Sequence, residues 1–262
     1  MYIHSSFKFI NSNEPALYYK KLVKQISSIN LRRSSKFDVL GVYGACNCID
    51  NIKYNKDLNI YLGSEYGVVS GITKVLPTLN NSDSIVMPFD FLNTNGNNAG
   101  FSISSALNTI GESMLINSNA FSFEHTLKFA YTKSLENHNF EALIGAIDES
   151  LDDIDDFNSI TNINSKNTND SSCFIYCNNI KQNAIAKIQE IEEFSSKLQL
   201  DEYLNKNNDY KIINHIQNDL SFASQTAVDL INSLKKEIKF ILVKQTNISI
   251  FIIKIDTCFN IL

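Results

Sequence analysis

Hydrophobic and polar positions follow two periods along the chain, and these predict strands and helices in turn. Residues 1–11 alternate as in a strand, and residues 14–29 repeat apolar side chains at helical spacing. Further strands are predicted over residues 58–62, 114–116, 141–148, 173–177, 238–243 and 248–255, and helices over residues 68–79, 101–107 and 222–236. Residues 184–198 fit a strand followed by a helix, or one amphipathic helix, which the spacing of Ile188, Ile191, Phe194 and Leu198 favours. This alternation predicts an α/β sandwich.

Residues 111–131 combine both periods around a sharp bend. An apolar strand, residues 114–116, runs through a polar bend into a helix that carries Phe123, Leu127 and Ala130 at helical spacing. A strand that turns abruptly into a helix can hold one side chain at the mouth of a pocket. The residue at this bend is Ala120, which has no reactive group.

Three polar segments interrupt the apolar pattern. Residues 93–100 are rich in Asn and Gly, so they can adopt left-handed backbone geometry and bring main-chain amides close to a neighbouring surface. Residues 150–171 are polar and acidic and are predicted to form an exposed loop, without the register of a calcium-binding loop. Arg32 and Arg33 are predicted to lie at a solvated helix start.

Composition narrows the class of protein. With 262 residues, 44% hydrophobic and 19% charged, the chain can bury the core of one large domain or of two fused half-domains. A net charge of -5 disfavours a nucleic-acid groove or an anionic membrane surface, although an acidic carrier protein can still dock on a local basic patch. We see no secretory signal and no apolar run of membrane-span length, so we expect a cytoplasmic protein.

The cysteines give little sign of a metal or of a disulfide framework. There are five, Cys46, Cys48, Cys173, Cys177 and Cys258, and their odd number and irregular spacing favour reduced thiols. The two close pairs can be assembled into a zinc site on paper, but neither has the usual two-residue spacing. We therefore expect no metal and no cofactor.

Several motifs together resemble one family. The pattern Gly63-x-x-x-Gly67, Phe91 followed by residues 97–100, the strand, bend and helix of residues 111–130, and the segment from Gly145 to Glu149 occur in the order and at the spacing of β-ketoacyl synthases. The match covers residues 31–149 and, more weakly, residues 171–177. The chain is most similar to the short chain-length-factor subunits of aryl-polyene-type ketosynthases, including the Leu-Arg-Arg run at residues 31–33.

The resemblance implies both a fold and a chemistry. The fold is a thiolase-like layered α/β sandwich with a shortened second half: one domain over residues 1–262, with a ketosynthase-like half at 1–178 and a truncated half at 179–262. The chemistry is Claisen condensation of acyl thioesters, which needs a cysteine thiolate at the bend. In the family's register that position is Ala120. Of the four histidines only His215 resembles the family's first histidine loop, and the Gly-Thr that should follow it is missing.

With the nucleophile and the histidine loops both lost, the resemblance implies a non-catalytic chain-length-factor-like partner. It would form a heterodimer with an active β-ketoacyl synthase in polyene, polyketide or fatty-acid-like biosynthesis, and would meet the acyl carrier protein only indirectly. The implied partner-facing residues are Leu115, Ile116, Asn117, Asn95, Asn97 and Asn98. The implied residues bounding the acyl tunnel are Phe91, Ala120, Phe121 and Phe123, although Phe121 and Phe123 can equally be core residues.

Two other functions stay open at this point. One is a stand-alone acyltransferase or thioester hydrolase that uses a remnant pocket through Ser118, Ser122 or His215. The other is a structural homologue that pairs with itself. A surface or capping position is the simpler interpretation of His215. Particle size with and without a ketosynthase separates these hypotheses.

Overall fold

The computed structural model describes residues 1–80, 84–150, 168–215 and 224–258. The strands are β1 (Tyr2–Ser12), β2 (Asn59–Gly63), β3 (Ser113–Ile116), β4 (Glu141–Asp148), β5 (Asn169–Asn178), β6 (Ala186–Phe194), β7 (Lys211–Asn214), β8 (Lys239–Gln245) and β9 (Ile250–Thr257). The helices are α1 (Ala16–Val23), α2 (Lys36–Cys48), α3 (Val69–Leu79), α4 (Pro88–Leu92), α5 (Asn97–Leu107), α6 (Ser122–Glu136), α8 (Lys197–Lys206) and α9 (Ser224–Leu234).

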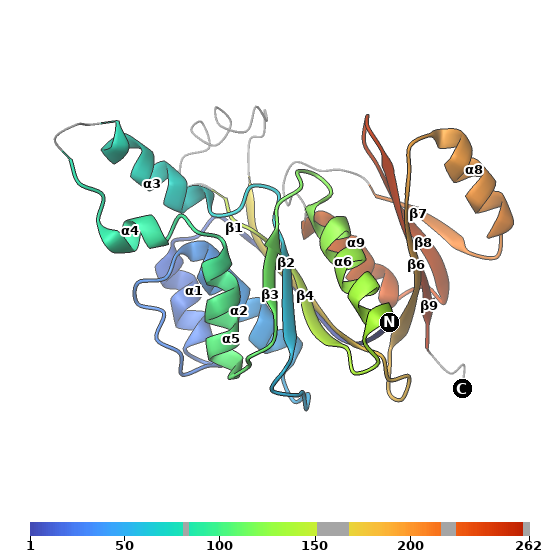
Figure 1. Ribbon diagram of the computed structural model, residues 1–262, viewed down its shortest axis with the longest axis horizontal. Helices are drawn as coiled ribbons and strands as arrows, with labels where there is room; N and C mark the ends of the chain where they lie inside the picture. The colour runs from blue at the N-terminus through green and yellow to red at the C-terminus, as the bar shows by residue number, and fades with distance from the viewer. Residues whose placement is uncertain (81–83, 151–167, 216–223, 259–262) are drawn as a thin grey trace.

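The described strands form one nine-stranded sheet in the order β3-β2-β4-β5-β1-β6-β9-β8-β7. Its two parts meet where β1 pairs with β6, and that ladder joins only Tyr2 with Lys187 and Ile3 with Ala186. Because the junction is so short, the two parts can turn to face each other. Helices α6 and α9 lie between them (Figure 1).

Three apolar clusters hold the layers together. The central cluster combines α6 and α9 with strands from both parts of the sheet, and includes Phe123 and Phe251. A second cluster packs α1, α2 and α5 on the outer face of the first part. A third packs α8 on the second part. The chain is therefore a layered α/β sandwich, as predicted.

The two parts of the sheet repeat one strand plan. In the first, β2 is parallel to β4, and β4, β5 and β1 follow antiparallel. In the second, β7 is parallel to β8, and β8, β9 and β6 follow antiparallel. Helix α6 precedes β4 as α9 precedes β8. The described second half has no counterpart of α3, α4, α5 or β3, which confirms the predicted shortening.

Local sequence explains where several elements begin and how closely they pack. Ser35 and Asp38 form a reciprocal capping box at the start of α2, which satisfies two backbone N–H groups. Gly96 and Gly100 let the start of α5 approach β3, since a Cβ on either would collide with the side chain of Leu115 or Ser113.

The prediction of one amphipathic helix over residues 184–198 is wrong. Residues 186–194 form β6, which pairs with β9 and β1. The ladder with β9 shifts register between Ile188 and Glu190, so Ile188 and Ile191 are both buried despite their spacing of three. A bulge in a strand thus imitates a helical period.

Two loop predictions also need correction. Ser150, Asp170 and Ser171 are buried, and β5 already begins at residue 169, so the ends of the predicted exposed loop belong to the core. The middle of that loop lies outside the described residues. In residues 93–100 no described residue has a positive φ, because α5 begins at residue 97; the left-handed residues include Gly67, Asn108 and Asn119 instead.

Helix α8 was not predicted because its sequence is largely polar, and Leu200 is its buried residue. Strand β7 was not predicted because it has only four residues. The helix predicted over residues 14–29 is shorter, with α1 ending at Val23.

No helix in the described part of the chain combines the length and apolar character needed to cross a membrane.

Candidate functional site

The bend between β3 and α6 is held by its own polar groups. Asn119 takes the left-handed conformation, with φ of 48°, which Asn tolerates better than most residues. The Ser122 hydroxyl accepts from the Ser118 N–H at 2.8 Å and donates to the Asn119 carbonyl at 2.6 Å. Ala120 lies half-buried between these contacts. The bend therefore has the predicted strand-to-helix form, with an inert methyl group at its tip.

The loop after β2 packs against this bend. A Cβ at Gly63 would lie 2.8 Å from the carbonyl oxygen of Ser122, so only glycine allows α6 to approach β2 so closely. The Asn117 side chain donates to the Ser64 carbonyl at 2.8 Å. Gly67, with φ of 68°, lets the same loop turn into α3. The predicted glycine motif thus shapes the neighbourhood of the bend.

A buried ion pair lies directly beside Ala120. The Lys244 ammonium, from β8, donates to the Ala120 carbonyl and, at 3.1 Å, to the Thr226 hydroxyl of α9. It lies 3.2 Å from the carboxylate of Glu124, and both side chains are almost fully buried. The geometry is that of an ion pair without an aligned hydrogen bond, since neither Glu124 oxygen has a hydrogen-bond partner among the described residues.

Asp148, at the end of β4, ties three elements together next to this pair. Its carboxylate accepts hydrogen bonds from the Ser64 hydroxyl, the Glu65 N–H and both the N–H and the hydroxyl of Ser224, at 2.8 to 3.0 Å. Burial raises the pKa of Asp148 to about 6, although these hydrogen bonds oppose the rise. Burial and the neighbouring charge of Asp148 raise the pKa of Glu65 to about 7, against the attraction of Lys244.

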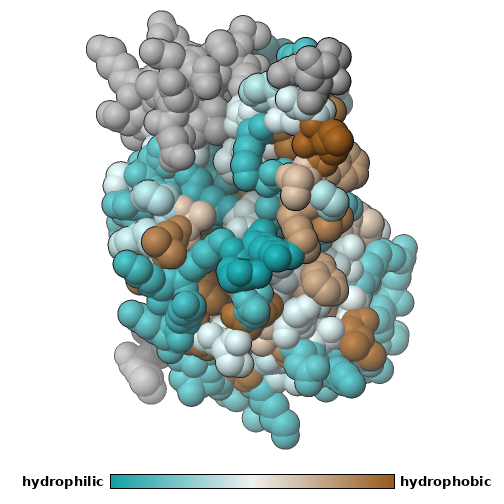
Figure 2. Space-filling view, turned by 90° about the vertical axis from the view of Figure 1, so that its left-hand side faces the viewer, coloured by the Kyte–Doolittle hydropathy of each residue, from teal (hydrophilic) through white to brown (hydrophobic). Residues whose placement is uncertain are grey.

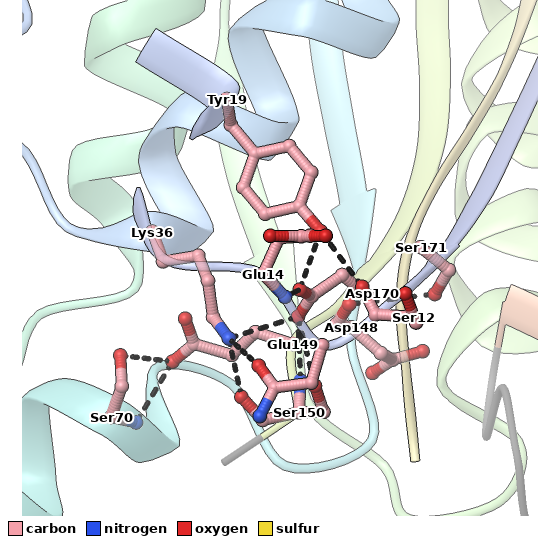
Figure 3. Close-up of polar contacts among 11 residues, drawn as sticks. Ser12, Glu14, Tyr19, Lys36, Ser70, Asp148, Glu149, Ser150, Asp170 and Ser171 are labelled. Carbon is pink, nitrogen blue, oxygen red and sulfur yellow. Dashed lines mark hydrogen bonds and ion pairs between the residues drawn. The ribbon is translucent and has the colours of Figure 1, made fainter. Parts of the chain in front are cut away.

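A second polar centre lies between β4, β5 and the starts of α2 and α3 (Figure 3). Asp170 accepts from the Tyr19 hydroxyl at 2.6 Å and pairs with Lys36 at 3.1 Å. The Lys36 ammonium also donates to the Ser150 carbonyl at 2.6 Å. Glu149 accepts from both the N–H and the hydroxyl of Ser70. These contacts fix the starts of both helices on the sheet, and a cavity of 400 Å³ lies beside them, lined by Lys36, Ser70 and Ser150 among others.

Replacing Glu149 with glutamine is expected to remove a pH-dependent loss of stability. Burial raises the pKa of Glu149 from 4.5 to about 7, so the folded state holds this proton more tightly than the unfolded state. The stability it contributes is complete below pH 4.5 and is lost as the pH rises through 7. The free energy of unfolding of Glu149→Gln relative to the native chain should therefore rise by about 3 kcal/mol between acid and alkaline pH. Urea unfolding across that range measures this, and a difference independent of pH would contradict it.

The predicted tunnel residues do not form one group. Phe121 and Phe123 are buried in the central cluster, where the Phe121 ring lies 5.0 Å from that of Phe251. Ala120 sits at the bend above them. Phe91 instead lies on α4, with 64% of its surface exposed.

The predicted partner-facing residues do lie along one border. Strand β3, with Leu115 and Ile116, is the terminal strand of the described sheet. Asn117 follows it and is exposed, as are Asn95 and Asn97 before and at the start of α5. Asn98 is half-buried and donates to the Leu92 carbonyl.

The residues that the alternative hydrolase would use make structural contacts instead. The Ser122 hydroxyl is buried and used in the bend, and Ser118 contributes its backbone N–H there. His215 does not have a surface side chain: its ring is 3% exposed, and its Nδ1 lies 2.7 Å from the Asp229 carboxylate.

The cysteines of the two close pairs lie in α2 and β5, and burial raises the pKa of Cys48 and Cys173 to about 12.

Sequence reasoning missed Lys244, Glu124 and Asp148 as a group. The available signal was a charged residue at an otherwise apolar position of a predicted strand or helix. Lys244 directly follows the apolar run of β8, and Glu124 follows Phe123 on the buried side of α6. Such charges are kept in a core when a partner compensates them.

Comparison with known proteins agrees with this architecture. No protein-family model and no curated protein matches the chain. Among solved structures it is similar to the ketosynthase ApeO in complex with its chain length factor ApeC from Xenorhabdus doucetiae, at 11% identity and a TM-score of 0.62, over 97% of this chain and 99% of that one. It is also similar to the ishigamide ketosynthase/chain length factor, at 8% identity and a TM-score of 0.74, over 98% and 99% of the two chains.

A third similar structure is AntDE:AntF, a type II acyl-carrier protein in complex with its ketosynthase bound to the hexaketide. It has 12% identity and a TM-score of 0.74, over 97% of this chain and 98% of that one. Identities this low establish the fold alone. The chain therefore has the thiolase-type fold of ketosynthases. Within that fold it is similar, over nearly its whole length, to structures of ketosynthases with their chain length factors, as the motifs predicted.

Proposed function

We propose that this chain is a non-catalytic, chain-length-factor-like partner of a β-ketoacyl synthase. The observation that carries the proposal is the combination of a ketosynthase fold with Ala120 at the tip of its bend. An acyl transfer through a covalent enzyme intermediate needs a nucleophile at that point, and alanine cannot serve as one. The Lys244 ammonium, which donates a hydrogen bond to the Ala120 carbonyl, also takes up space beside the tip of the bend.

The border of β3 supports a heterodimer. A terminal strand has unpaired backbone groups along its outer edge, which a strand of another chain can satisfy. Exposed apolar side chains also lie on and beside α3 and α4, which precede α5 in the chain, and α4 has no buried residue. They include Leu76, Leu79, Met87, Phe89, Phe91 and Leu92. Figure 2 shows apolar surface gathered toward the upper right of the face that α3 and α4 share.

A patch of this kind on one face is typical of a protein interface. Helix α5 connects α4 to β3 in the chain, and Gly96 and Gly100 bring the start of α5 against that strand. A partner that covered β3, α3 and α4 together would bury both the free edge and the apolar patch. In that assembly Phe91 would contribute to the partner's side of an acyl tunnel, while Phe121 and Phe123 would bound its end from within this chain.

We further infer that the assembly acts in polyene, polyketide or fatty-acid-like biosynthesis, with acyl groups delivered to the synthase by a carrier protein. The two residues that line the proposed tunnel end are bulky and buried, so they would limit chain growth by steric exclusion. Exchange of Phe121 for alanine should then lengthen the products, which mass spectrometry of the released acyl chains would measure.

Co-expression with a β-ketoacyl synthase encoded beside it tests the proposal. We expect a stable 1:1 complex, whereas the chain expressed alone should self-associate through its exposed apolar face. Size-exclusion chromatography with light scattering distinguishes these states. The proposal would be refuted if the chain were a monodisperse monomer that binds no such synthase. An acylated peptide from this chain after incubation with acyl-carrier substrates would favour the stand-alone enzyme instead.

A further inference from the structure

The internal repeat leaves one strand position unfilled in the described second half. In the first half, the edge of β2 that faces away from β4 pairs with β3 in parallel, from Ile60 with Ser113 to Gly63 with Ile116. Strand β7 occupies the place of β2 in the second half, because it is parallel to β8 as β2 is to β4. No described strand pairs with the other edge of β7.

A groove lies at this position. A cavity of 590 Å³ separates β7 from α9, the helix that corresponds to α6. One wall is β7 itself, residues 211–214, and the other is a polar face of α9 that includes Gln225, Asp229, Asn232 and Ser233. In the first half, β3 occupies the corresponding place beside β2, and α6 contacts both strands.

The backbone of β7 is oriented to pair outward. The His215 N–H donates to the Val243 carbonyl of β8 at 2.7 Å. Because backbone groups alternate between the two edges of a strand, Ile213 and Lys211 also face β8, whereas Ile212 and Asn214 direct their N–H and C=O groups away from it. The Ile212 side chain is 44% exposed.

Three of the four charged residues that line the groove are already compensated; Lys236, which follows α9, has no ion pair among the described residues. Lys211 pairs with Glu237 at 2.5 Å, and Asp229 accepts from Gln225 at 3.0 Å while lying 2.7 Å from His215. An occupant that lies beside these compensated residues is therefore selected by its backbone and by uncharged polar side chains toward α9.

We propose that the outer edge of β7 binds an extended segment of a partner protein, which adds a strand parallel to β7. The segment is uncharged, has high strand propensity, and presents polar side chains such as threonine to α9. Recognition of this kind takes its affinity from main-chain hydrogen bonds. The site lies at the opposite end of the sheet from β3, so it is independent of the proposed ketosynthase interface.

A fluorescein-labelled peptide, Ser-Thr-Val-Thr-Val-Thr-Ser, tests the site by fluorescence anisotropy with the full chain. We expect saturable binding that Ile212→Pro weakens by about tenfold, because proline removes an outward N–H and is tolerated on an edge strand. The matched control Ile212→Val keeps that N–H and should bind like the native chain. A peptide N-methylated at its threonines should lose about the same factor, whatever the fold of the proline variant, because it lacks donors toward β7.

Absence of saturable binding at millimolar peptide would overturn the proposal. So would equal binding of the N-methylated peptide, or a dimer of the native chain that Ile212→Pro dissociates, since a second copy would then be the occupant. Assembly with a ketosynthase should not change in Ile212→Pro, so failure here leaves the proposed function standing.

Discussion

Phe91→Asp is expected to abolish assembly with the ketosynthase while leaving the chain folded. The Phe91 ring is 64% exposed on a helix without buried residues, so its loss removes no core contact. In the proposed interface it would be a desolvated aromatic anchor, and a carboxylate there would be buried without a partner. Substitutions of such anchors typically cost about 2 to 4 kcal/mol of binding free energy, or roughly 30- to 1000-fold in affinity.

The control for this variant is Leu198→Asp. Leu198 lies on α8 and is 70% exposed, but α8 packs on the other part of the sheet. It introduces the same charge at comparable exposure far from β3. Titration calorimetry of each variant with the ketosynthase should show lost affinity for Phe91→Asp alone. Native affinity in Phe91→Asp would place the interface elsewhere.

The second large effect is expected from the ion pair beside Ala120. Lys244→Met keeps most of the apolar stem but leaves the Glu124 carboxylate buried without compensation. Removing one partner of a buried pair typically destabilises a protein by about 3 to 5 kcal/mol. That is a large share of the stability of a domain, which is about 5 to 15 kcal/mol. Urea unfolding of the isolated chain measures the loss.

The double variant Lys244→Met with Glu124→Gln separates the pair from its packing. With both charges gone, the stability should return to within about 1 to 2 kcal/mol of the native value, since hydrophobic replacement of a buried pair is often neutral. A loss of less than about 1 kcal/mol in the single variant would contradict the expected cost of an uncompensated buried carboxylate. This measurement does not depend on any partner, so it tests the site and not the proposed function.

Most element types followed from residues close together in the sequence. The strand, bend and helix around Ala120 are encoded locally: apolar residues 114–116 form a strand, Asn119 tolerates a positive φ, and Phe123 and Leu127 share one face of α6. Helix α8 escaped prediction because polar side chains dominate it, and strand β7 escaped because it has only four residues. The bulge in β6 escaped for another reason, since its position depends on the ladder with β9.

The sequence alone determined that the bend carries alanine, at the position where the resemblance to β-ketoacyl synthases expects a cysteine, and that strands and helices alternate as in a layered sandwich. Each of these depends on residue identity or on periods within one segment. Only the tertiary structure decided that Lys244 reaches the Ala120 carbonyl, that Asp148 accepts hydrogen bonds from Ser224, and that β3 and β7 are the two end strands of the described sheet. Those contacts join segments far apart in the chain, and their partners are chosen by how the layers pack.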